Sequence, residues 1–171
     1  MTAQEAKAAA DMIAGWWDGE FRSTCEVIAA VKDENRNYKP DPKSRSAWEL
    51  AVHLATADVW FPDSIASGAF VYDQAAAKQA ESQFRTVADI VAFYKKALPE
   101  KLQALRALPA EKMTDTLDFF GVMKMSRAQF VLFANNHSAH HRGQLAAYLR
   151  ALGSKVPNIY GPSADAEPAR A

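Results

Sequence analysis

The sequence has 171 residues, of which 49% are hydrophobic and 23% charged, the size and composition of one globular domain with its own core. Twenty basic side chains balance twenty acidic ones, so no global field would draw the protein to nucleic acid or to an anionic membrane. The single cysteine excludes an internal disulfide and a CxxC motif. We expect a cytoplasmic protein, because we find neither a signal-peptide pattern nor an apolar run of about 18 residues.

Helical periodicity dominates the first part of the chain. Apolar residues recur at spacings of three and four from about Ala3 to Val31, which predicts a first helix. The polar stretch from Lys32 to Lys43 holds two prolines and predicts a loop. Ser46 and Glu49 form a Ser-x-x-Glu capping box, which predicts that a second helix opens there. Pro62 is expected to kink or end this helix near its last turn.

The middle of the chain is less regular. Residues 67–85 show no clear period, and we expect a long irregular loop after the second helix. Thr86 and Asp89 then predict the start of a third helix. Pro99 falls inside the apolar stripe of this helix, so a kink or a break is expected there.

The last third begins with a pattern typical of a hairpin, in residues 115–125 around Gly121. Ser126 is expected to cap the last helix, and Gly153 suits the position just after its end. Residues 154–171 are rich in Pro, Ala and Ser, which predicts a loosely held tail. We find no repeat or linker. The sequence therefore predicts a single all-α domain over residues 1–171, with its core over about 3–153, folded as a four-helix bundle.

Three of the four histidines lie within five residues on the last predicted helix. His137 and His141 are four residues apart, so they point the same way from successive turns, as in the helical His-x-x-x-His zinc motifs. His140 is three residues after His137 and can substitute geometrically, but it lies to one side of the inward seam. We expect His137 and His141 to form the pair.

A complete metal site needs a further ligand from elsewhere, and His53 is the only histidine left. Three imidazoles would leave open positions for water or substrate, which is typical of a catalytic site. Glu49 lies one turn before His53 and is a candidate hydrogen-bond acceptor behind a ligand or a fourth ligand, although its capping box with Ser46 explains it equally well. The competing interpretation is that these histidines are hydrogen-bonded core residues without a metal.

The string from His137 to Gln144, His-Ser-Ala-His-His-Arg-Gly-Gln, resembles the last-helix motif His-x-x-His-His-Arg-Gly-Gln of the DinB-like (damage-inducible, YfiT-related) family. The segment from Ser46 to His53 resembles the second-helix pattern of that family, with Ser, Glu and His at the same intervals. The resemblance spans about residues 10–162. One departure stands at Arg45, where the family often has Trp; it leaves the metal ligands intact and bears on the shape of the nearby pocket.

The resemblance implies a bundle with up-down-down-up connectivity, often as a homodimer. It also implies one divalent metal ion, zinc or nickel, on three histidines that correspond to His53, His137 and His141. Some members of the family are thiol transferases that use a low-molecular-weight bacterial thiol, and others are hydrolase- or isomerase-like. For this chain the resemblance therefore implies a metal-dependent enzyme of the thiol-transferase or hydrolase type, with a small-molecule substrate or thiol as its partner.

The residues around the histidine pair bear on the type of chemistry. Ser138 stands where the Glu of a His-Glu-x-x-His motif would be, which argues against a metalloprotease of that type. A metal-bound thiolate needs no protein base, so thiol activation fits better. Two other hypotheses remain: a non-catalytic metal-binding stress-response module, and a structural helical homodimer with three buried neutral histidines.

The sequence also leads to expectations for residues outside the three histidines. Arg142 and Gln144 are expected to pair with neighbouring helices rather than with substrate. Tyr160 is expected to fold back over either the metal or a partner subunit. Asp58 lies five residues after His53, well off its face, and we discount it as a ligand.

Overall fold

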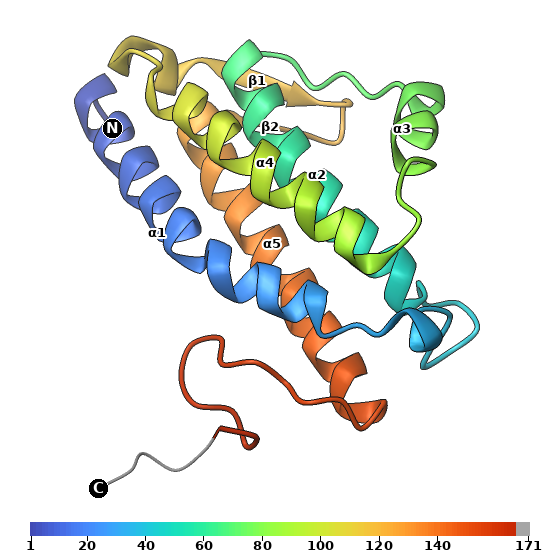
Figure 1. The fold of residues 1–171 in the computed structure, drawn as a ribbon. Helices are drawn as coiled ribbons and strands as arrows, with labels where there is room; N and C mark the ends of the chain where they lie inside the picture. Colours follow the sequence, from blue (N-terminus) through green and yellow to red (C-terminus); the bar gives the residue numbers. More distant parts are fainter. Residues whose placement is uncertain (167–171) are drawn as a thin grey trace, which may run out of the picture.

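The computed structural model describes residues 1–166 and is mostly helical. Four long helices, α1 (Ala3–Ala29), α2 (Ala47–Ser67), α4 (Val87–Arg106) and α5 (Arg127–Ala151), pack around one apolar core (Figure 1). Both α1 and α2 contact α4 and α5, so the four helices enclose the core between them. The short elements are two 3-10 turns, one helix and two strands: Asp33–Asn35, Ala110–Thr114, α3 (Gln74–Glu81), β1 (Thr116–Phe119) and β2 (Met123–Ser126).

Side-chain caps explain where the long helices begin. The Ser46 backbone N–H donates to Glu49 Oε2 at 2.7 Å, and the Glu49 N–H donates to Ser46 Oγ at 3.1 Å. This reciprocal pair satisfies two of the free donors at the start of α2. The other long helices begin in the same way, at Thr2, Thr86 and Ser126. The predicted starts of the second, third and last helices are confirmed.

The segment predicted as an irregular loop, residues 67–85, contains the helix α3. Its start is fixed by Asp73, whose Oδ1 accepts hydrogen bonds from the backbone N–H groups of Ala75 and Ala76 at 2.9 and 3.0 Å. The run of alanines that follows has high helix propensity. None of the side chains of α3 is buried, so no apolar period marks this helix in the sequence.

The two prolines do not interrupt their helices. α2 continues past Pro62 to Ser67, and α4 continues past Pro99 to Arg106, so the expectation that either helix ends or breaks at its proline is wrong. A proline removes only one backbone donor, and buried side chains on both sides hold each helix against the core. Around Pro99 these side chains are Leu98 and Leu102, which are 0% and 1% exposed.

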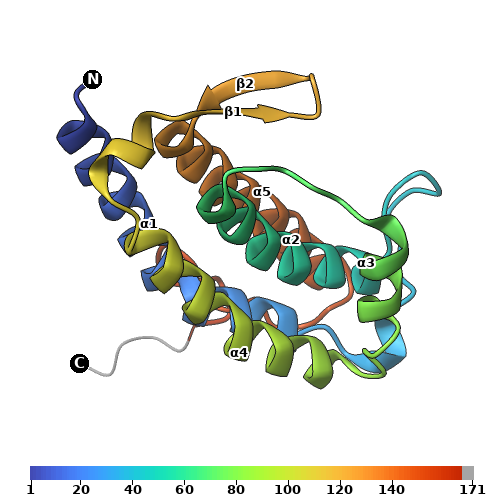
Figure 2. The same ribbon diagram turned by 90° about the horizontal axis from the view of Figure 1, so that it is seen from above.

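The structure contains a two-stranded antiparallel sheet, which the prediction of an all-α domain did not include. β1 pairs with β2, with Thr116 opposite Ser126 and Phe119 opposite Met123. The connecting turn has Phe120 and Gly121 at φ of 52° and 73°, a left-handed pair that matches the twist of a short hairpin. The hairpin lies at the end of the helices from which α5 starts (Figure 2). The hairpin pattern around Gly121 is thereby confirmed, and the fold is mostly helical rather than wholly so.

The segment after α5 makes specific contacts as far as it is described. Gly153 follows the helix with φ of 67°, as its sequence position predicts. Beyond Gly153, the carboxylate of Asp165 turns back to α5, where its Oδ2 lies 2.7 Å from Nη2 of Arg150. The prediction of a loosely held tail also covers residues 167–171, which lie outside the described residues. Within residues 1–166, none of the helices has the length and apolar character needed to cross a membrane.

Candidate metal centre

The three histidines singled out in the sequence come together between α2 and α5. The Nε2 atom of His53 lies 3.2 Å from Nε2 of His137 and 3.2 Å from Nε2 of His141. One potential ligand atom from each residue lies within 4.8 Å of the other two. Two imidazole nitrogens bound to one tetrahedral zinc at about 2.0–2.1 Å are separated by about 3.3 Å. The spacing of the rings therefore fits one shared metal ion.

The protonation of these rings favours a cation between them. Burial lowers the pKa of His53 to about 4 and that of His137 to about 3, so both rings are neutral at pH 7. The Nδ1 of His141 lies 2.8 Å from Gln144 Oε1, which can only accept a hydrogen bond. His141 therefore carries its proton on Nδ1 and turns the Nε2 lone pair toward the other two rings. A single proton on His53 Nε2 can satisfy only one of its two neighbours, whereas one cation satisfies all three.

The two weighed alternatives lie outside this group. His140 is exposed on α5 and does not join the three converging nitrogens. Glu49 is held by its capping box with Ser46, and its Oε2 pairs with Lys39 Nζ at 3.2 Å. The contacts of Glu49 with other described residues therefore give it a role at the start of α2 rather than as a metal ligand.

A buried carboxylate next to the centre fixes one side of α5. Asp58, on α2, is 0% exposed, and its Oδ2 accepts hydrogen bonds from Ser138 Oγ at 2.7 Å and from Tyr94 Oη at 2.8 Å. Burial raises the pKa of Asp58 to about 7. Because Ser138 follows His137 directly, this bond helps to set the rotation at which His137 faces α2. Asp58 does not belong to the group of converging histidine nitrogens, and the sequence did not reveal this network.

A buried arginine fixes the other side of the same helix. Arg142 follows His141 and is 0% exposed; its guanidinium donates to Thr24 Oγ1 at 2.9 Å and pairs with Glu20 Oε2 at 2.8 Å. Both partners lie on α1, so the expected role of Arg142 as a link between helices is confirmed. Tyr160 folds back onto this arginine, with its hydroxyl 2.6 Å from Nη2, and not over the histidines.

Gln144 departs from the expectation. It was expected to pair with a neighbouring helix, but it contacts His141 on its own helix. The three-residue spacing between them, which brings side chains together on one helix face, was the available signal. The ring of His137 is held in a different way, by packing against Phe61 with their ring centroids 5.1 Å apart.

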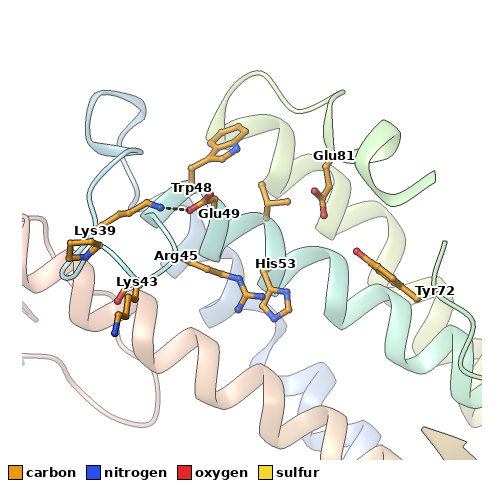
Figure 3. A pocket seen from close by; sticks show the side chains of 11 residues that line it. Lys39, Lys43, Arg45, Trp48, Glu49, His53, Tyr72 and Glu81 are labelled. Carbon is orange, nitrogen blue, oxygen red and sulfur yellow. Dashed lines mark ion pairs between the residues drawn. The ribbon is translucent and has the colours of Figure 1, made fainter. Parts of the chain in front are cut away.

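Two cavities open beside the histidines. The larger, of about 620 Å³, lies between α2 and α3 and has His53 and His137 in its wall. The smaller, of about 510 Å³, also reaches His53 and is lined mainly by polar and charged side chains from the segment before α2 and from its first turns (Figure 3). Arg45 lines both cavities, and its positive charge adds to the effect of burial in lowering the pKa of His53. A metal ion held by these rings would therefore be accessible to small molecules.

The sequence model of the DinB family matches residues 4–169 of this chain. The chain belongs to the DinB family. The resemblance drawn from the two histidine motifs is thereby confirmed, over nearly the whole sequence.

Relatives of this DinB-family chain include two uncharacterized proteins of Bacillus subtilis. YjoA is 30% identical over 134 residues, which cover 76% of this chain and 82% of YjoA. YrdA is 26% identical over 149 residues, which cover 86% of this chain and 85% of YrdA.

Solved structures of DinB-like proteins share the fold. One from Bacillus cereus superposes with a TM-score of 0.70 at 25% identity, covering 86% of this chain and 95% of its own. The structure of YjoA from Bacillus subtilis gives a TM-score of 0.68 at 24% identity, covering 89% of this chain and 99% of its own. These comparisons establish family and fold, and the chemistry of the site has to be argued from its own residues.

Proposed function

We propose that this DinB-family protein binds one divalent metal ion, zinc or nickel, through His53, His137 and His141 and acts as a metal-dependent enzyme of the thiol-transferase type. The observation that carries the proposal is the convergence of three ring nitrogens, two of them 3.2 Å from that of His53, together with the position of His53 in the walls of two cavities. A structural zinc site closes all four positions with protein ligands, whereas a catalytic one leaves a position for substrate.

The residues around the rings prepare them for ligation. When bound, the ion supplies Lewis acidity and lowers the pKa of a thiol or water that it holds. Gln144 keeps the proton of His141 on Nδ1, which leaves Nε2 free, and Phe61 packs against His137. Burial keeps His53 and His137 neutral, the form in which an imidazole binds a metal.

The nearby carboxylates favour thiol over water as the activated group. Glu49 is committed to the cap of α2 and to Lys39, and the Asp58 carboxylate accepts hydrogen bonds from Tyr94 and Ser138. Neither belongs to the group of converging ligand atoms. A bound metal lowers the pKa of water only to about 7, whereas a thiol that it binds is fully deprotonated at neutral pH, so the thiol has less need of a protein base. A hydrolase of the same metal site is the alternative.

The remaining parts of the proposal concern the assembly. We infer the up-down-down-up bundle of the family, which is supported by the directions of the helices in Figure 1, where α1 and α5 run one way and α2 and α4 the other. A homodimer is supported by exposed apolar side chains on α1, Met12 at 72% and Trp16 at 62% exposure. The proposed setting is the cytoplasm.

Cobalt(II) substitution tests the open position and the thiol together. We expect the cobalt-loaded protein to gain a sulfur-to-cobalt charge-transfer absorption when L-cysteine is added, and to gain none with L-serine. The chain's own thiol cannot supply this signal, because Cys25 is buried outside the group of ligands and burial raises its pKa. A cobalt-loaded protein whose spectrum ignores saturating cysteine would contradict the thiol-transferase type.

A further inference from the structure

Arg45 places an unpaired positive charge beside the candidate metal centre. It lies just before α2 and lines both cavities together with His53, and Figure 3 shows its side chain directed toward that histidine. Within residues 1–166 its guanidinium takes part in no ion pair, whereas Lys39, in the smaller cavity, is neutralised by Glu49 at 3.2 Å. A guanidinium with a free face binds a carboxylate through two parallel hydrogen bonds.

The larger cavity offers an apolar space next to this charge. Its volume of about 620 Å³ lies within the usual range for small-molecule sites, about 300–1,000 Å³. Aromatic side chains from α2, β1, α4 and α5 form much of the wall: Trp60, Phe61, Phe93, Phe119 and Phe133. The α3 side contributes alanines and the Glu81 carboxylate, and the Asp73 carboxylate in this wall is occupied with capping that helix.

The balance of free charges indicates what kind of anion fits. Of the charged residues lining the smaller cavity, Arg45 and Lys43 form no ion pair among the described residues, and neither does Glu81 on the acidic side. One net positive charge remains in the smaller cavity, and in the larger one Arg45 shares the wall with the Glu81 and Asp73 carboxylates, so the local charge suits a singly charged anion better than a phosphate of charge near two. The planar fork of arginine also matches a carboxylate in geometry.

We propose that the substrate of this site is an amphipathic carboxylic acid, with its carboxylate on Arg45 and its apolar body between Trp60, Phe61 and Phe133. The inference rests on the proposed function, since it takes the histidine centre as the place of reaction. Arg45 is then a specificity-determining residue. It selects the acid over a neutral analogue of the same shape, and the aromatic wall selects apolar bodies of limited size.

Binding of 3-phenylpropanoate, followed by NMR titration, tests this assignment. Its neutral match is 3-phenylpropanamide, which keeps the apolar body and removes the charge. In the wild-type protein we expect the acid to bind about tenfold more tightly than the amide, the size of a charge-assisted hydrogen bond near the surface. Arg45→Gln should erase that preference by weakening the acid alone. Arg22→Gln is the matched control, because it removes an arginine on α1 that lines neither cavity.

A second variant tests the apolar half of the site. Ala76 is an exposed α3 residue in the wall of the larger cavity, so Ala76→Trp should fill that space without disturbing the core. It is expected to weaken the acid and the amide by the same factor. Undiminished binding of both probes in this variant would show that the cavity does not hold the apolar body.

Zinc-loaded and metal-free samples separate this inference from the proposed function. The metal content of each sample reports on the histidine centre, and the acid-to-amide ratio reports on Arg45. Equal affinity for the acid in wild type and Arg45→Gln overturns the inference whether or not zinc is bound, and in a zinc-loaded sample it would place the carboxylate on the metal. Loss of zinc from Arg45→Gln would also overturn it, because the arginine would then support the ligands instead of the substrate.

Discussion

Replacing His141 with alanine should weaken zinc binding by at least about 100-fold, whereas replacing its neighbour His140 should leave the affinity within about twofold. Loss of a hydrogen-bond partner behind a ligand already costs about 10–100-fold in metal affinity, and loss of the ligand itself removes a coordinate bond. His141 Nε2 lies 3.2 Å from His53 Nε2, while His140 is exposed and outside the group. Competition with a chromophoric chelator measures both affinities.

The adjacent positions of these residues make the comparison well controlled. Both substitutions remove an imidazole from the same turn of α5, so a general effect on the helix would appear in both variants. Circular dichroism of the metal-free variants checks that each retains the fold. Equal losses of affinity would mean that the ligands on α5 are assigned wrongly.

The second large effect is on thermal stability. Zinc at 100 times its Kd should raise the free energy of unfolding by about 2.7 kcal/mol, which corresponds to a rise in Tm on the order of 5–10 °C for a domain of this size. The metal-free protein should still unfold cooperatively, because its apolar core does not depend on the ion. Melting curves of zinc-loaded and metal-free protein measure the difference. Complete unfolding on metal removal at room temperature would instead make the site structural.

The pH dependence of that difference follows from the histidine pKa values. Burial lowers the folded pKa of His53 to about 4 and of His137 to about 3, from an ordinary value of 6.5. The stability linked to these rings in the metal-free protein is present above about 6.5 and is lost as the pH falls through the folded values. Protons compete with zinc for His53 and His137 in the folded state below about pH 4, and for His141, whose pKa burial also lowers, below its ordinary value of 6.5. The zinc-dependent rise in Tm should therefore be full at pH 8 and largely lost at pH 3.5. An equal rise at pH 3.5 and pH 8 would contradict histidine ligation.

The pH dependence of stability that is linked to Asp58 has the opposite sign. It cancels when the melting curves with and without zinc are subtracted from each other. The folded pKa of Asp58 is raised by burial to about 7 from 3.8, so the stability linked to its protonated form is present below about 3.8 and is lost as the pH rises through about 7. This contribution is the same with and without zinc, because Asp58 is hydrogen-bonded to Tyr94 and Ser138 rather than to a ligand. The difference between the two melting curves isolates the metal.

Local signals in the sequence predicted most of the helices and the members of the site. The capping boxes at Ser46 and Thr86 mark helix starts because their hydrogen bonds join residues only three apart. The four-residue spacing of His137 and His141 fixes their common face, and His53 followed by elimination. These features needed no knowledge of how the helices pack.

The features that sequence reasoning missed depend on packing between distant segments. The bond of Asp58 to Ser138 joins residues 80 positions apart, and nothing local distinguishes Asp58 from an exposed polar residue. Arg142 was expected to pair with another helix, but its partner Thr24 lies 118 positions away and could not be identified from the sequence. The helix α3 escaped because it buries no side chain and so shows no apolar period. The cavity between α2 and α3, and with it the position of Arg45 in the cavity wall, could be seen only once that helix was in place.

Elemental analysis of the metal bound per chain tests the central claim most directly. Protein purified without chelators, and metal-free protein re-loaded with zinc or nickel, should each hold close to one divalent ion per chain. The variant His53→Ala/His137→Ala/His141→Ala should hold none while keeping its helical circular dichroism. Wild-type protein that carries no metal after purification, and takes up neither zinc nor nickel when they are added, would contradict the assignment of His53, His137 and His141 as a metal centre.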